Sequence, residues 1–173
     1  ELLEEFFLWL REEHPDVLVI NSAGNGASYS GRDEYRLPSS FITEQLLVVG
    51  GHQRSKKDEV EIDDPGYAVK RDSSNVDMRV DITAAACAQA STHEVDATGD
   101  VHCGTSYATP LVTGVVAAML SINPQLQPEQ VRMLLRRSAM TIGGEYDFEP
   151  MDAEDLTAPI LPSERNYELS DKD

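Results

Sequence analysis

Positive charge is scarce in this sequence, and it has no long uninterrupted hydrophobic run. Its 173 residues include 14 Lys and Arg against 31 Asp and Glu, which gives a formal net charge of −17. Such an excess of negative charge argues against nucleic acid and anionic membrane surfaces as partners. The longest apolar stretch, residues 111–120, is interrupted by Thr113 and Gly114 and is shorter than the roughly 18 residues of a membrane span. We therefore expect neither a nucleic-acid-binding protein nor a membrane protein.

The sequence also lacks the spacing of a calcium-binding loop. Residues 52–66 are rich in charged side chains and end in Pro65 and Gly66, but they contain no Asp-x-Asp-x-Asp-Gly pattern. We interpret this stretch as a solvated insertion, and no metal ion is implied by its residues.

One stretch leads a serine directly into an apolar helix. Residues 104–110 read Gly-Thr-Ser-Tyr-Ala-Thr-Pro, and residues 111–120 are apolar on nearly every side, as in a buried helix. Pro110 fits the first turn of such a helix, where a missing N–H costs little. Ser106 then lies at the N-terminus, where free N–H groups and the helix dipole favour negative charge. Taken alone, Ser106 could equally be an N-cap residue of a core helix.

The pattern Gly-Thr-Ser-x-Ala-x-Pro before an apolar helix resembles the nucleophile motif of the subtilisin-like serine peptidases. The resemblance implies an α/β fold of three layers, α/β/α, around a mostly parallel sheet, with Ser106 as the nucleophile. It also implies a protein or peptide substrate and no required cofactor. Structural calcium ions and an extracellular or periplasmic location are common in the family, so only the resemblance suggests them here.

A second motif supports the same resemblance. Residues 17–20 form an apolar run typical of a buried parallel strand, and the chain then breaks into small residues up to Gly26. Ala23-Gly24-Asn25 matches the strand end that carries the oxyanion-hole asparagine of the family. The resemblance therefore implies that the Asn25 amide is an oxyanion donor and that Ala23 and Gly24 bind substrate. By itself, Asn25 beside glycine is also typical of a turn.

The chain departs from the family pattern near the expected cleft. Arg36 stands before Leu37-Pro38, where the family has a small residue near the floor of the substrate side-chain pocket. There it would favour an acidic side chain or close the pocket, although a solvated surface arginine fits the sequence as well. Asn75-Val76 and residues 84–86 replace the residues usual in the family, so we expect the shape of the cleft to differ.

Cys87 and Cys103 flank a segment with turn signals at residues 97–100. If the two arms of this segment pair, the cysteines lie opposite each other near its base, where a disulfide could form. Buried free thiols are equally consistent with two cysteines.

The chain contains no histidine that fits the catalytic base. His102 and Asp96 lie in patterns similar to the base and acid motifs, but both come shortly before Ser106, whereas base and nucleophile must come from separate elements. In the subtilisin order Asp and His precede the oxyanion asparagine, so we expect them in sequence that this chain does not include. We interpret His14, His52 and His93 as surface histidines.

We therefore predict that residues 1–143 are the C-terminal half of a subtilisin-like domain. Its elements would be an amphipathic helix over residues 1–13, strands at 17–20, 46–51 and 80–83, the Ser106 helix and a helix over 128–139. In that last helix, the final arginines would complement the helix dipole. Residues 144–173 are acidic, contain several prolines and are expected to be extended or disordered.

The full-length protein is then expected to be a serine endopeptidase, with the missing N-terminal half as a partner of this chain. Alone, the chain should be inactive and should self-associate through apolar surface that the other half would cover. The alternative is a non-catalytic module with a structural or protein-binding role.

Overall fold

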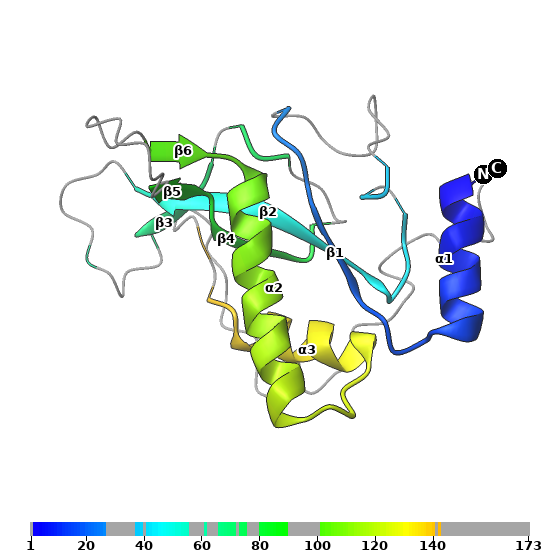
Figure 1. Cartoon of the computed structure of the whole chain (residues 1–173). Helices are drawn as coiled ribbons and strands as arrows, with labels where there is room; N and C mark the ends of the chain where they lie inside the picture. The colour runs from blue at the N-terminus through cyan, green and yellow to red at the C-terminus, as the bar shows by residue number, and fades with distance from the viewer. Residues whose placement is uncertain are drawn as a thin grey trace, which may run out of the picture.

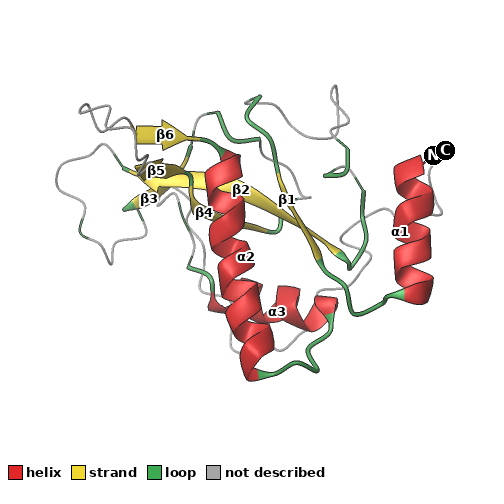
Figure 2. Cartoon of the chain, in the orientation of Figure 1, coloured by secondary structure: helices red, strands yellow, loops and turns green. Residues whose placement is uncertain are grey.

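A computed structural model describes residues 2–26, 37–39, 41–55, 61, 66–71, 73–75, 80–89, 101–140 and 142. Along the chain, one helix comes first, the strands follow, and two further helices end the described part (Figures 1 and 2). The elements are α1 (Leu2–Glu13), β1 (Val19–Ser22), β2 (Leu46–Arg54), β3 (Ala68–Lys70), β4 (Ile82–Ala85), β5 (Cys87–Gln89), β6 (Val101–Cys103), α2 (Thr105–Ile122) and α3 (Pro128–Ser138).

The main sheet is built on β2. β1 pairs with it in parallel from Val19 opposite Leu46, and β4 pairs in parallel from Ile82 opposite Val49. β3 pairs antiparallel with the last three residues of β2. The sheet is therefore mostly parallel, as predicted. β3 and the extension of β2 to Arg54 were missed, because the sequence there looks like a charged insertion.

Alternate residues of β2 face opposite sides of the sheet, which creates the three layers. Leu46 and Val48 pack with Phe7 and Leu10 of α1 in one buried cluster. Leu47 and Val49 belong to a second cluster that includes Val112 and Val116 of α2 and Val131 and Leu135 of α3. Because side chains alternate along a strand, one strand holds helices on both faces. The α/β/α fold class is thus confirmed.

α2 is buried on one side only. Ala108, Val112 and Val116 are buried, whereas Leu111 and Val115 are each about half exposed. Our expectation of a helix buried on nearly every side is therefore wrong, and so is the expectation that it is too short for a bilayer. Its 18 residues reach the length and apolar composition of a membrane span, although one such helix is weak evidence for one. Figure 1 shows α2 lying across the sheet, on which its buried residues pack.

Pro110 lies in the second turn of α2 and not in the first, because the helix already begins at Thr105. A proline has no N–H, so the carbonyl of Ser106 receives no intrahelical bond from residue 110. The helix continues past this position to Ile122.

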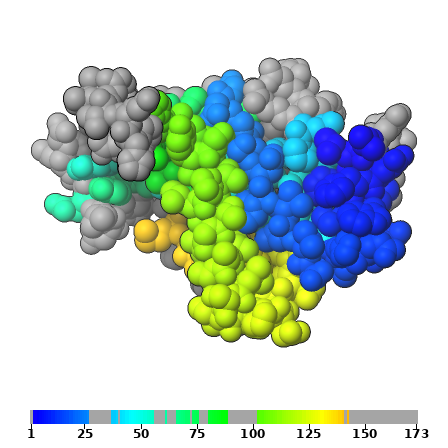
Figure 3. Space-filling view, viewed as in Figure 1, coloured from blue at the N-terminus to red at the C-terminus, as the bar shows by residue number. Residues whose placement is uncertain are grey.

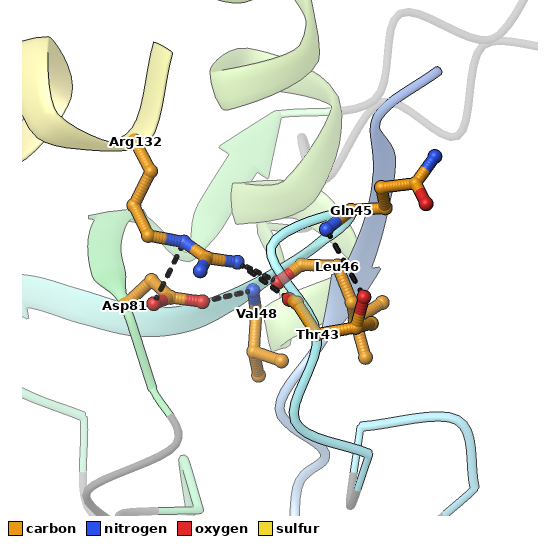
Figure 4. A network of polar contacts seen from close by, with 6 residues as sticks. All are labelled: Thr43, Gln45, Leu46, Val48, Asp81 and Arg132. Atoms are coloured by element: carbon orange, nitrogen blue, oxygen red, sulfur yellow. Dashed lines mark hydrogen bonds and ion pairs between the residues drawn. The ribbon is translucent and has the colours of Figure 1, made fainter. Parts of the chain in front are cut away.

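Arg132 fastens α3 to the sheet (Figure 4). Its guanidinium lies 3.4 Å from the Asp81 carboxylate, and it donates hydrogen bonds to the carbonyls of Thr43, at 3.0 Å, and Leu46. The other Asp81 oxygen accepts from the Val48 N–H at 2.8 Å. Arg136 and Arg137 are in the last helical turn, as the dipole preference predicts, but Arg132 is buried and has this separate structural role.

β5 and β6 form a two-stranded antiparallel sheet in which Cys87 lies opposite Cys103. The two residues are joined by a disulfide. β6 leads directly into α2 through Gly104, whose N–H donates to the carbonyl of Ala86 at 2.7 Å. This hairpin therefore fixes the approach of the chain to the start of α2.

Candidate functional site

Ser106 is the second residue of α2 and its side chain is exposed. Within the described part of the chain, no residue forms a hydrogen bond with its hydroxyl. The N–H groups of the first helical turn lack intrahelical carbonyl partners, so the backbone N–H of Ser106 can donate to a ligand. The structure thus places an accessible hydroxyl and a backbone donor at one helix N-terminus.

The side chain of Asn25 lies at the same helix end. Its Oδ1 accepts a hydrogen bond from the Thr105 N–H at 2.8 Å and one from the Thr105 hydroxyl at 3.2 Å. A backbone N–H can only donate, so the atom facing it must be the amide oxygen. This assigns the orientation of the amide and leaves the Nδ2 group as a donor for another acceptor. Asn25 is itself exposed, so a ligand can reach it.

The backbone on either side of Asn25 is fixed by buried contacts. Gly24 has a φ of 98°, a left-handed conformation that glycine adopts most easily, and its N–H donates to the Thr105 hydroxyl at 3.3 Å. The Ala23 N–H donates to the carbonyl of Val49 at 2.8 Å. The carbonyls of Ala23 and Gly24 both accept hydrogen bonds from Asn75, at 2.9 Å each. Their backbone groups are thus engaged within the protein.

Ser106 borders a depression between α2 and β1. It has a volume of about 440 Å³ and is lined by Asn21, Ser22, Ser106, Thr109, Pro110 and Thr113. In the space-filling view α2 and β1 lie side by side on this face (Figure 3). Four of the six lining residues carry a hydroxyl, but most of the exposed lining surface is apolar.

None of the described histidines forms a hydrogen bond with Ser106. His14 packs against Trp9, with 4.9 Å between ring centroids, and His102 stacks on Tyr107 at 6.4 Å. We predicted His52 to be a surface residue, and this is wrong. It is half-buried in β2, and its Nδ1 lies 3.1 Å from the Thr83 hydroxyl. Burial lowers the pKa of His52 below its ordinary 6.5, because the charged ring loses hydration.

Several sequence-based predictions lie outside the described residues. They concern Arg36, His93, Asp96, most of the charged stretch at 52–66 and the tail at 144–173. Among the residues that the structure does describe, no group of three or more His, Cys, Asp or Glu side chains could hold a metal ion.

Sequence reasoning overlooked two residues of this site. Thr105 was considered only as part of the motif around Ser106, although it is fully buried and contacts both Gly24 and Asn25. Asn75 was noted only as a departure from a family pattern. Its side chain is buried and reaches residues about 50 positions earlier, which no local pattern could reveal.

One protein-family model matches most of this chain. The model of the subtilase family of peptidases (Peptidase_S8) matches residues 4–165. One similar solved structure is described as the "crystal structure of a cold adapted subtilisin-like serine proteinase", with 26% sequence identity and a TM-score of 0.46. The match covers 71% of this chain but only 39% of that protein. No curated protein matches the chain.

Proposed function

The chain belongs to the subtilase family, and we propose that it supplies the nucleophile and one oxyanion donor of a serine endopeptidase. The observation that carries the proposal is the pairing of Asn25 with Thr105, the residue next to Ser106. This pairing keeps the Asn25 amide at the helix N-terminus that carries the Ser106 hydroxyl, although the two residues are about 80 positions apart in the sequence. The catalytic histidine and aspartate would come from sequence that these 173 residues do not include.

In the proposed reaction, the Ser106 hydroxyl attacks the carbonyl carbon of a peptide bond. The histidine takes the proton of the hydroxyl and later delivers it to the leaving amine. As the carbonyl oxygen gains negative charge, it accepts hydrogen bonds from Asn25 Nδ2 and from the Ser106 N–H. The N-terminus of α2 adds a favourable dipole at the same point. Hydrolysis of the acyl-enzyme by water then restores the serine.

The proposal can be tested with a fluorophosphonate probe, which labels an activated serine. A longer protein that contains this chain together with the preceding half of the domain should be labelled, and its Ser106→Ala variant should not. The 173-residue chain alone should remain unlabelled, because none of its described residues is positioned to take the proton from Ser106. Labelling that persists in Ser106→Ala would overturn the proposal.

A non-catalytic role in protein binding is the second candidate. The Ser106 hydroxyl has no basic partner among the described residues, which favours this alternative. It predicts that neither the longer protein nor its Ser106→Ala variant reacts with the probe. The same experiment therefore separates the two functions.

Specificity is proposed to depend on Arg36. An arginine beside the pocket for the substrate side chain would favour an acidic side chain there or narrow the pocket. To test this, a peptide library is cleaved by the longer protein and by its Arg36→Gly variant, and the residues preferred at that substrate position are compared. If the preference at that position is unchanged, Arg36 has no such role. For Ala23 and Gly24, substrate binding stays a prediction of the resemblance, because both residues are buried in the described structure.

Self-association of the isolated chain is proposed as well. Leu111, Val115 and Ile122 expose a line of apolar side chains along α2, and exposed patches of this kind favour association. Light scattering of the isolated chain would test this, and a single monomeric species would contradict it. The disulfide between Cys87 and Cys103 supports an extracellular or periplasmic location, where disulfides persist.

A further inference from the structure

We propose that Asn75 is a positioning residue that holds Asn25 in the geometry needed to bind the oxyanion. The inference rests on the proposed function, because it assigns Asn75 a role that acts through Asn25. Asn75 comes from the segment before β4, far from both Asn25 and Ser106 in sequence.

Three hydrogen bonds connect Asn75 to the backbone around Asn25. Its Nδ2 donates to the Ala23 carbonyl at 2.9 Å, and its own N–H donates to the Gly24 carbonyl at 2.9 Å. Its Oδ1 accepts from the Gly26 N–H at 2.9 Å. The residues before and after Asn25 are thus held by Asn75, through its backbone N–H and both polar atoms of its side chain.

Asn75 is itself rigidly supported. It is 1% exposed, and the neighbouring Ser74 hydroxyl donates to its carbonyl at 3.2 Å. The same hydroxyl accepts from the Gly51 N–H of β2 at 2.9 Å. The central strand therefore fixes Ser74 and Asn75, and Asn75 fixes residues 23–26.

Thr105 completes the support from the other side. It holds the Asn25 oxygen and the Gly24 N–H, whereas Asn75 holds the carbonyls of Ala23 and Gly24 and the N–H of Gly26. Asn25 is exposed, so its direction depends on these contacts and not on packing around its side chain. In Asn75→Ala, residues 23–26 lose the two side-chain contacts, at the Ala23 carbonyl and the Gly26 N–H, whereas the bond from the backbone N–H of residue 75 to Gly24 can remain. A small displacement of a catalytic donor can lower the rate substantially.

The test is a double-mutant cycle in the longer protein, with kcat and KM measured for a peptide substrate. Asn75→Ala should lower kcat about tenfold or more with little change in KM, because the oxyanion forms only in the transition state. In the background of Asn25→Ala, the same substitution should lower kcat less than about twofold further, because the donor that it positions is already gone.

Gln45→Ala is the matched control. Gln45 is also a buried side-chain amide that donates to backbone carbonyls, those of Leu10, His14 and Val17, but it lies away from the site. The Gln45→Ala substitution should lower the free energy of unfolding and leave kcat unchanged. If Asn75→Ala fails to fold, Asn75→Asp keeps the shape and the acceptor for Gly26 but loses the donor to Ala23, and its kcat should also fall.

The outcomes separate the inference from the proposed function. Additive losses for Asn25 and Asn75, or wild-type kcat in a folded Asn75 variant, would overturn the positioning role while Ser106→Ala still abolishes activity. Full activity in Ser106→Ala would overturn the proposed function itself. A loss in Asn75→Ala that disappears in the Asn25→Ala background supports the inference.

Discussion

The amide oxygen of Asn25 lies 2.8 Å from the backbone nitrogen of Thr105 and accepts its hydrogen bond. Thr105 is the first residue of α2, and the preceding residue, Gly104, has no side chain with which to cap the helix. Asn25 therefore caps α2 from a distant part of the chain. One residue stabilises the helix N-terminus with its oxygen and leaves its NH₂ group as a donor at the same helix end.

Asn25→Asp should separate these two roles. The carboxylate can still accept from Thr105, and its charge is favourable at a helix N-terminus, so stability should be unchanged or higher by about 0.3–1 kcal/mol. The donor is lost, so kcat should fall by about 10²–10³-fold, a range taken from the corresponding donor of subtilisin. Urea unfolding and steady-state kinetics of the longer protein provide the two measurements.

Asn25→Ala is the companion variant, which removes both the cap and the donor. It should show the same loss in kcat together with a loss of about 0.5–2 kcal/mol in stability. If Asn25→Asp retained wild-type kcat, the NH₂ group of Asn25 would not be the oxyanion donor.

Arg132→Ala should destabilise the fold strongly. Removing one partner of a buried ion pair leaves the other charge uncompensated and costs about 3–5 kcal/mol. The carbonyls of Thr43 and Leu46 would also lose a donor. Arg137→Ala on the same helix is the control, because its exposed side chain should change the free energy of unfolding by less than about 0.5 kcal/mol. Equal effects of the two variants would contradict a structural role for Arg132.

Removal of the disulfide should destabilise the protein without changing the fold. The two cysteines are 16 residues apart, and closing a loop of about this length contributes roughly 3 kcal/mol in the chain-entropy description. The Cys87→Ala/Cys103→Ala variant and the reduced wild-type protein should lose similar amounts in chemical unfolding. Mass spectrometry without reductant should find no alkylatable thiol in the wild type, and free thiols there would contradict the bond.

The stability of the protein should depend on pH through His52. Its pKa in the folded state is lowered by burial, so as pH falls below about 6.5 the unfolded chain takes up a proton first. The free energy of unfolding should therefore decrease as pH falls from 6.5 towards the lowered pKa. His52→Gln should flatten this part of the stability curve, and an unchanged slope in the variant would show that another group is responsible.

Local patterns were sufficient to predict the family and most of the elements. The helices at Leu2–Glu13 and Pro128–Ser138 follow from hydrophobic periodicity, and parallel pairing of β1 and β2 follows from their apolar runs. The charged end of β2 was misread as an insertion, because its pairing with β3 depends on a strand about 15 residues later. His52 was misread for the same reason, since its burial comes from strands that pack around it.

The sequence by itself predicted which residues would carry the proposed chemistry, because a nucleophile motif and an oxyanion motif are short and each lies in one continuous stretch. Only the tertiary structure decided how the side chains of these residues are positioned and oriented. The contacts of Asn25 with Thr105, and of Asn75 with Ala23, Gly24 and Gly26, join segments separated by about 50–80 residues. Hydrogen bonds between such distant residues are specified only after the hydrophobic faces of β2 have brought the helices and strands together, so no local pattern could predict them.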